Sequence, residues 1–138
     1  MIIKNVLIVD DNIADIYLTK EVLEESAYNL ALKVFEAKDG ETGLNIVETE
    51  SIDLIMLDIK MPKMNGFEML KILKEKYPNI VVIMLTTSDY DKDIMDSYNL
   101  KADAYIVKPI DTNDFEKKIQ TVNNIYLQRY FEFINFKK

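Results

Sequence analysis

Three acids and one amine of this chain stand in places where side chains can carry phosphate or metal chemistry. Each directly follows a short apolar run: Asp10 and Asp11 follow 6–9, Asp58 follows 54–57, and Lys108 follows 104–107. Asp58 is also followed by a loop that contains Pro62 and Gly66. An acid between a buried-strand pattern and such a loop indicates the carboxyl edge of a parallel sheet, where open α/β folds bind ligands.

The acids predict a site for a divalent cation. Two carboxylates about 4 Å apart repel by roughly 4 kcal/mol at an effective dielectric near 20. Three acids therefore share a crevice only if a cation compensates or some protons stay bound. Hard oxygen ligands select Mg²⁺ or Ca²⁺, and Mg²⁺ prefers few protein carboxylates. We expect Mg²⁺, with Mn²⁺ as the alternative, held by Asp10 or Asp11, by Asp58 and by one loop carbonyl.

The same residues predict phosphoryl transfer to a carboxylate. One oxygen of Asp58 stays free to attack phosphorus, as acid side chains do in covalent phosphoryl intermediates. Lys108 would supply positive charge to the phosphoryl oxygens, and the hydroxyl of Thr86, at the end of another apolar run, would donate a hydrogen bond. We expect Asp58 to accept a phosphoryl group and later to lose it to water.

Strands and helices alternate along the chain and would position these residues. Apolar runs predict strands over 6–9, 30–35, 54–57, 80–85 and 104–107. Helical spacing predicts helices over 13–26, 40–48, 66–76, 89–100 and 112 to about 131. Asp11 or Asn12 would cap the first helix, and Ile94, Met95 and Tyr98 would face inward from the fourth.

Five such units predict an α/β fold of the flavodoxin-like, doubly wound class. The sheet would have five parallel strands in the order 2-1-3-4-5, with helices on both faces. In that order the first and third strands are neighbours, so Asp10, Asp11 and Asp58 would meet in one crevice.

Composition excludes several other classes of function. The 138 residues suit one domain, and the net charge of −7 argues against direct DNA binding. There is no cysteine and no histidine, which excludes disulfides, thiol catalysis, histidine triads and histidine metal sites within this chain. No apolar run is long enough for a membrane span. We expect a cytoplasmic protein.

Four ordered segments make the chain resemble a response-regulator receiver domain of two-component signalling, the CheY-like family. The segments are Val6-Leu7-Ile8-Val9-Asp10-Asp11-Asn12, Leu54 to Gly66, Met84-Leu85-Thr86-Thr87, and Ala102 to Pro109. The match covers about residues 4–127, and its start is also similar to single-domain regulators that partner phytochrome-type sensor kinases.

The resemblance implies a role for each site residue. Asp58 would be the phosphoacceptor, Asp10 and Asp11 the metal acids, and Lys108 the contact to the phosphoryl group. The backbone carbonyl of Lys60 would complete the metal site. Thr86 and Tyr105 would be the switch pair, in which the hydroxyl moves toward the phosphoryl group and the ring swings inward.

Three positions depart from the common family pattern. Lys60 stands where an amide or small residue is frequent, Thr87 replaces Ala or Ser, and Lys101 replaces the Gly that commonly precedes Ala102. These departures leave the phosphoryl chemistry intact.

The resemblance further implies a signalling phosphoacceptor rather than an enzyme. Residues 1–127 would form the receiver domain, and 128–138 an aromatic extension of the last helix. The phosphoryl donor would be a sensor histidine kinase or a phosphotransfer protein, and the signal would leave through contact with a downstream protein. The aromatic tail either folds back on the body or, with the last helix, forms a homodimer surface.

Simpler interpretations stand beside these. Asp10 and Asp11 also fit as ordinary helix caps, Asp58 as a turn acid and Lys108 as a solvated amine. Two rival functions remain: a receiver-like interaction module that is not phosphorylated, and an aspartyl-phosphate hydrolase. The hydrolase would need an acid two residues after Asp58, where this chain has Lys60.

Overall fold

The structure is a computed structural model that describes residues 4–26, 32–108, 113–114 and 117. Within these ranges five strands form one sheet: β1 (Lys4–Val9), β2 (Leu32–Ala37), β3 (Leu54–Leu57), β4 (Val81–Thr86) and β5 (Ala104–Val107). All neighbouring strands are parallel, and their order is β2-β1-β3-β4-β5. The predicted fold class and strand order are confirmed.

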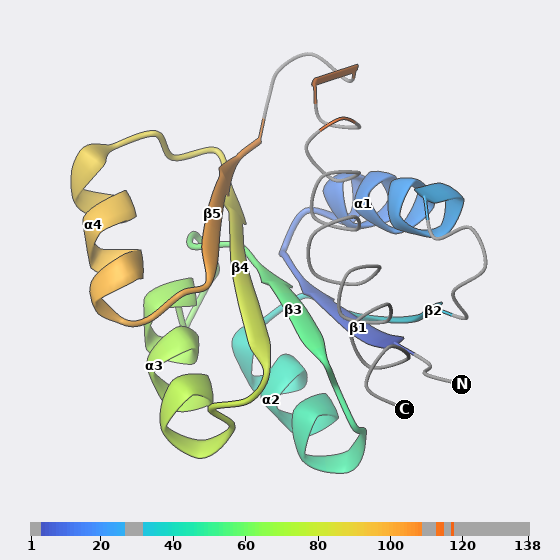
Figure 1. Cartoon of the computed structure of the whole chain (residues 1–138), viewed down its shortest axis with the longest axis horizontal. Coiled ribbons are helices and arrows are strands. Elements are labelled where there is room, and N and C mark those ends of the chain that lie inside the picture. The colour runs from blue at the N-terminus through green and yellow to red at the C-terminus, as the bar shows by residue number, and fades with distance from the viewer. Residues whose placement is uncertain (1–3, 27–31, 109–112, 115–116, 118–138) are drawn as a thin grey trace, which may run out of the picture.

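Helices cover both faces of this sheet (Figure 1). They are α1 (Ile13–Ser26), α2 (Gly40–Thr49), α3 (Gly66–Lys76) and α4 (Asp91–Asn99). Ile16 and Leu23 of α1 pack against one face, and Val47 of α2 and Met69 of α3 pack against the other.

The central strands are buried on both sides, as their continuous apolar sequences predict. In β1, Val6 and Ile8 belong to the core beneath α1, whereas Leu7 and Val9 belong to the core beneath α2 and α3. This alternation follows from the two-residue period of a strand. A double-faced core holds the ends of β1 and β3 rigidly side by side.

Polar side chains mark the starts of the helices next to the site. Asn12 Oδ1 accepts a hydrogen bond from the backbone N–H of Asp15, so Asn12 rather than Asp11 caps α1. Asn65 and Glu68 form a capping box at the start of α3. Because such caps satisfy otherwise unpaired N–H groups, the loops at the sheet edge end at defined residues.

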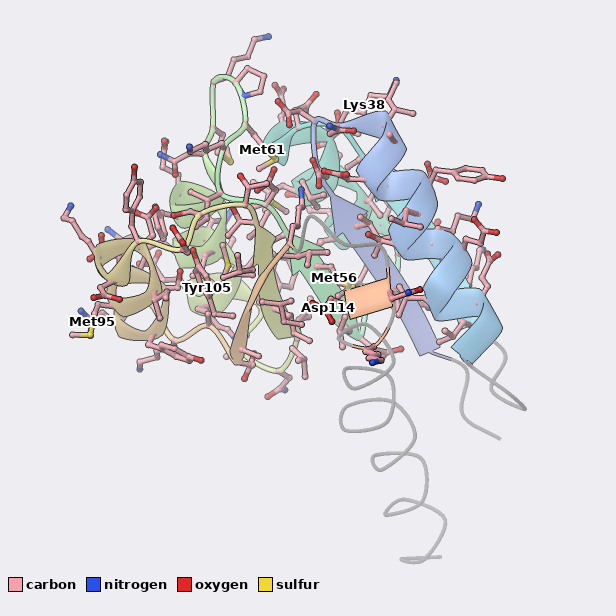
Figure 2. All side chains as sticks on the ribbon, turned by 90° about the horizontal axis from the view of Figure 1, so that it is seen from above. Lys38, Met56, Met61, Met95, Tyr105 and Asp114 are labelled. Carbon is pink, nitrogen blue, oxygen red and sulfur yellow. The ribbon has the colours of Figure 1, made fainter. Side chains whose placement is uncertain are left out.

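The predicted inner face of α4 is partly wrong. Met95 and Tyr98 are 62% and 52% exposed, and Ser97 is the buried residue of this helix. Figure 2 shows Met95 on the outer side of α4. The Ser97 hydroxyl donates a hydrogen bond to the carbonyl of Asp93, which satisfies this polar group where it is buried.

The last predicted helix and the aromatic tail lie almost entirely outside the described residues. Asn113, Asp114 and Lys117 are helical, in agreement with a helix that starts near 112. The division into residues 1–127 and 128–138 stays a prediction. Among the residues that the structure describes, no helix is both long enough and apolar enough to cross a membrane.

Candidate functional site

Asp10, Asp11 and Asp58 meet at the carboxyl edge of the sheet. Val9 and Leu57 are register partners in β1 and β3, so the next residue of each strand lies beside the other. The N–H of Asp58 donates to the carbonyl of Val9 at 3.0 Å, which ties the two strand ends together. One carboxylate oxygen from each of the three acids lies within 4.8 Å of the others.

The three acids differ in burial. Asp10 and Asp58 are 3% and 8% exposed, whereas Asp11 is exposed to solvent. Oδ1 of Asp10 accepts the N–H of Asn12 at 2.9 Å, and Oδ1 of Asp58 accepts the N–H of Ile59 at 2.8 Å. These backbone bonds orient both carboxylates, so that each Oδ2 faces Lys108.

Lys108 brings its ammonium into the middle of the acids. Its Nζ lies 2.6 Å from Asp10 Oδ2 and 3.6 Å from Asp58 Oδ2. The side chain is only 7% exposed. The backbone N–H of Lys108 donates to the carbonyl of Thr86 at 2.7 Å, which holds the end of β5 against the end of β4.

Asp15 is a further member of the site, and the sequence patterns did not predict it. Its Oδ2 lies 2.9 Å from Lys108 Nζ, although 93 residues separate the two in sequence. An acid in the first turn of a helix is ordinarily explained by the helix dipole. The sequence therefore carries no signal that distinguishes Asp15 from a common helix-start acid.

Burial and charge act together on the buried pair. Burial raises the pKa of Asp10 to about 6, although the hydrogen bond from Lys108 pulls it downward. Burial also opposes a charge on Lys108, but hydrogen bonds to Asp10 and Asp15 raise the pKa of this amine above its usual value. The short contact between Asp10 and Lys108 therefore offsets part of the effect of burial on both groups.

Thr86 and Tyr105 are linked through one loop residue. Thr86 is fully buried at the end of β4, and its Oγ1 accepts the N–H of Ser88 at 3.4 Å. Tyr105 lies on β5 (Figure 2), and its hydroxyl donates to the carbonyl of Ser88 at 2.8 Å. Burial raises the pKa of Tyr105 above its usual value. The two predicted switch residues thus hold opposite backbone groups of Ser88.

Gly66 allows the loop after β3 to close tightly behind Asp58. Its N–H donates to the carbonyl of Ile59 at 2.7 Å. A Cβ at this position would overlap the Asp58 carbonyl oxygen and lie 2.8 Å from the Cα of Ile59. The start of α3 can therefore approach the backbone of Asp58 only because residue 66 has no side chain.

The donor set fits a hard divalent cation. Asp10, Asp11 and Asp58 bring one carboxylate oxygen each within 4.8 Å of one another, and the ammonium of Lys108 lies beside Asp10 and Asp58, so the three acids outnumber the amine. Carboxylate oxygens with room for water are the ligands that Mg²⁺ takes. Lys60 follows two residues after Asp58 and its side chain is exposed; the role of its carbonyl as a ligand stays a prediction.

Comparison with protein families identifies one match that covers most of the chain. Residues 6–120 match the response regulator receiver domain. The chain is 34% identical over 119 residues to the alkaline phosphatase synthesis transcriptional regulatory protein PhoP of Bacillus subtilis, covering 86% of this chain and 48% of PhoP. It is 37% identical over 117 residues to the transcriptional regulatory protein CpxR of Escherichia coli, covering 85% of this chain and 48% of CpxR. The chain thus spans about half the length of these curated relatives.

Solved structures of similar size also match. The Mn²⁺-bound form of response regulator Rcp1 superimposes with a TM-score of 0.80 at 29% identity, covering 90% of this chain and 94% of Rcp1. The phosphorylated cyanobacterial phytochrome response regulator RcpA superimposes with a TM-score of 0.83 at 30% identity, covering 91% of this chain and 95% of RcpA.

Proposed function

Because the chain belongs to the response regulator receiver domain family, we propose that Asp58 accepts a phosphoryl group in a Mg²⁺-dependent reaction. The donor is a phosphohistidine of a sensor histidine kinase or a phosphotransfer protein, since this chain has no histidine. The observation that supports this most is the convergence of Asp10, Asp11, Asp58 and Lys108 at one sheet edge.

Each residue has a defined task in this proposal. Oδ2 of Asp58 forms the new O–P bond while the P–N bond of the donor breaks, and the donor imidazole keeps the electron pair and takes up a proton. Asp10, Asp11, Asp58 and the carbonyl of Lys60 would hold Mg²⁺, which when bound stabilises negative charge on the transferring group. Lys108 Nζ lies 3.6 Å from Oδ2 of Asp58 and needs only a short shift to contact a phosphoryl oxygen.

The same charge would operate the switch. A phosphoryl group adds about −1.5 to −2 charge. The Thr86 hydroxyl would turn to donate to it and give up the N–H of Ser88, which it accepts at 3.4 Å. Ser88 also accepts the Tyr105 hydroxyl, so movement of this loop would release the ring. The affected surface would lie around β4 and β5, which carry Thr86 and Tyr105, and the sequence predicts that the last helix also contributes to it.

The test is phosphorylation by acetyl phosphate with Mg²⁺, followed by intact mass. We expect the mass of one phosphoryl group on the wild-type chain, lost in Asp58→Asn and on chelation of Mg²⁺. Asp91→Asn is the matched control, because Asp91 is an exposed acid of α4. If the wild-type chain gains no phosphoryl mass, a receiver-like module that is not phosphorylated becomes the better interpretation.

The proposal extends to a single-domain regulator that signals by protein contact. It is supported by the 94% and 95% coverage of Rcp1 and RcpA, and by the net charge of −7, which disfavours DNA. PhoP and CpxR, about twice as long, are the competing precedent. The mass of the endogenous protein on an immunoblot distinguishes a single-domain regulator from a longer one. A product of about twice this length would contradict the single-domain proposal.

The last helix and the aromatic tail are proposed as a homodimer surface. Five aromatic residues lie within the last 13 residues: Tyr126, Tyr130, Phe131, Phe133 and Phe136. Truncation after Asn124 and sedimentation of both forms test this. If both the full chain and the truncated form sediment as monomers, the homodimer proposal is contradicted.

A further inference from the structure

The ammonium of Lys108 is held most closely by two acids, and one of them has no part in the metal cluster. Lys108 Nζ lies 2.6 Å from Asp10 and 2.9 Å from Asp15, but 3.6 Å from Asp58. The first two distances are hydrogen bonds, whereas 3.6 Å is too long for one. In this state Lys108 is directed to Asp10 and Asp15 rather than to the proposed phosphoacceptor.

The backbone of Asp15 is held by the start of α1. Its backbone N–H donates to Oδ1 of Asn12, and the N–H of Asn12 donates to Oδ1 of Asp10. One turn of chain therefore carries both partners of Lys108. Any movement of the ammonium toward Asp58 has to occur on the lysine side, because Asp10 and Asp15 belong to the same capped turn.

The two partners respond differently to a bound cation. Asp10 belongs to the group of acids whose oxygens lie within 4.8 Å of one another. A cation bound by this group would interact with the carboxylate of Asp10 and weaken the attraction of that carboxylate for Lys108. Asp15 is not a member of that group. When the cation is present, Asp15 remains as the carboxylate that competes with a phosphoryl group on Asp58 for Lys108.

We propose that Asp15 is a positioning residue that restrains Lys108 in the unphosphorylated state and so opposes its contact with a phosphoryl group. This inference rests on the proposed phosphoacceptor function of Asp58. On phosphorylation Lys108 exchanges Asp15 for a phosphoryl oxygen. Asp15 then returns to solvent at little cost, since its side chain is already 34% exposed.

The test measures binding of beryllofluoride, a tetrahedral phosphoryl mimic, to the full chain at saturating Mg²⁺. Asp15→Asn should bind it about two- to fivefold more tightly than wild type, the range that corresponds to loss of a partly exposed ion pair. Asp15→Glu keeps a carboxylate within reach of Lys108 and should restore the wild-type affinity. Glu24→Gln removes an exposed charge from α1 about 13 Å farther along the helix and should change nothing.

Repeating the titration at about 0.1 M and 1 M salt separates contact from long-range charge, because screening shortens the electrostatic range from about 10 Å to 3 Å. A gain that persists at high salt supports the restraint. An unchanged or weaker affinity in Asp15→Asn, or a gain that disappears at high salt, overturns it. A merely structural role is distinguished as well, since damage to the site would weaken binding rather than tighten it.

The same measurements distinguish a failure of the Asp15 restraint from a failure of the proposed phosphoacceptor function of Asp58. Wild-type binding that is lost in Asp58→Asn supports the phosphoacceptor site, whatever Asp15→Asn does. If wild type and Asp15→Asn both fail to bind the mimic with Mg²⁺, the phosphoacceptor proposal fails and the restraint fails with it.

Discussion

Lys108 Nζ lies 2.6 Å from Oδ2 of Asp10, so the amine that would meet a phosphoryl group is already paired with a proposed metal ligand. Both side chains are buried, at 7% and 4% exposure. A cation at Asp10 and the ammonium of Lys108 therefore compete for one carboxylate. Metal binding and the position of Lys108 are coupled in this site.

Replacing Lys108 by Gln should destabilise the metal-free protein and increase its response to Mg²⁺. Removal of one partner leaves Asp10 buried without its countercharge, which costs about 3 kcal/mol of unfolding free energy. Mg²⁺ then replaces the lost charge and stabilises the variant more than the wild type. Urea unfolding with and without Mg²⁺ measures both effects. Lys92→Gln is the control, because its pair with Asp96 is exposed; equal Mg²⁺ increments in variant and wild type would contradict the coupling.

Substitutions of Asp10 and Asp11 should both weaken metal binding but should differ in their effect on protein stability. Asp11 is exposed and lies close to two other acids, so Asp11→Asn relieves repulsion and should not lower the unfolding midpoint of the metal-free protein. It should still weaken Mn²⁺ binding by about tenfold or more, because a charge at contact distance contributes over ~1.4 kcal/mol. Asp10→Asn should weaken binding and also lower the midpoint, since Lys108 loses its nearest partner. Mn²⁺ titration and thermal unfolding test this, and equal midpoints for the two variants would be inconsistent with it.

Gly66→Ala should be far more damaging than Gly40→Ala. The added methyl group at 66 meets backbone, the Asp58 carbonyl oxygen and the Ile59 Cα, which cannot move aside. At 40 it meets the side chain of Met64, whose sulfur lies 2.7 Å away and can shift. We expect a loss of about 3 kcal/mol for Gly66→Ala and clearly less for Gly40→Ala. Chemical denaturation of both variants checks the difference, and equal losses would show that the loop behind Asp58 is not tightly packed.

Lys101→Gly should stabilise the protein. Lys101 has φ of 70°, a left-handed conformation that costs a residue with a side chain about 1–2 kcal/mol. Its N–H donates to the carbonyl of Tyr98, a bond that glycine keeps. We expect a gain of about 1 kcal/mol in unfolding free energy. Lys76→Gly, in the last turn of α3, is the control and should lower the unfolding free energy. A loss of stability in both variants would mean that the added chain entropy of glycine outweighs the relief of backbone strain at position 101.

Much of the site could be predicted because strand ends are a local property of the sequence. Asp10, Asp58 and Lys108 each follow an apolar run, and parallel strands bring their carboxyl ends to one edge. The strand order places Asp10 and Asp58 on adjacent strands, as expected from alternating strands and helices. Proximity of the acids therefore follows from pattern and topology, without knowledge of any side-chain contact.

The helix surfaces were less predictable. In α4, Met95 and Tyr98 have the right chemistry for a core but remain exposed, whereas Ser97 is buried. A nine-residue helix can rotate its small apolar surface either way at low cost. Which face of α4 is buried depends on its packing against the rest of the fold, and spacing along the chain does not encode that packing.

The sequence by itself determined the fold class, the cluster of acids and the choice of Lys108 as the amine. The reason is that apolar strand patterns and the polar residues that follow them are local features of short sequence segments. Only the tertiary structure assigned Lys108 to Asp10 and Asp15, since β3 and β4 separate β5 from β1 in the sheet. That pairing depends on how α1 packs over the sheet and how far a lysine side chain reaches across two strands. Both are consequences of packing between distant segments, and Asp15 in the sequence is an ordinary first-turn acid.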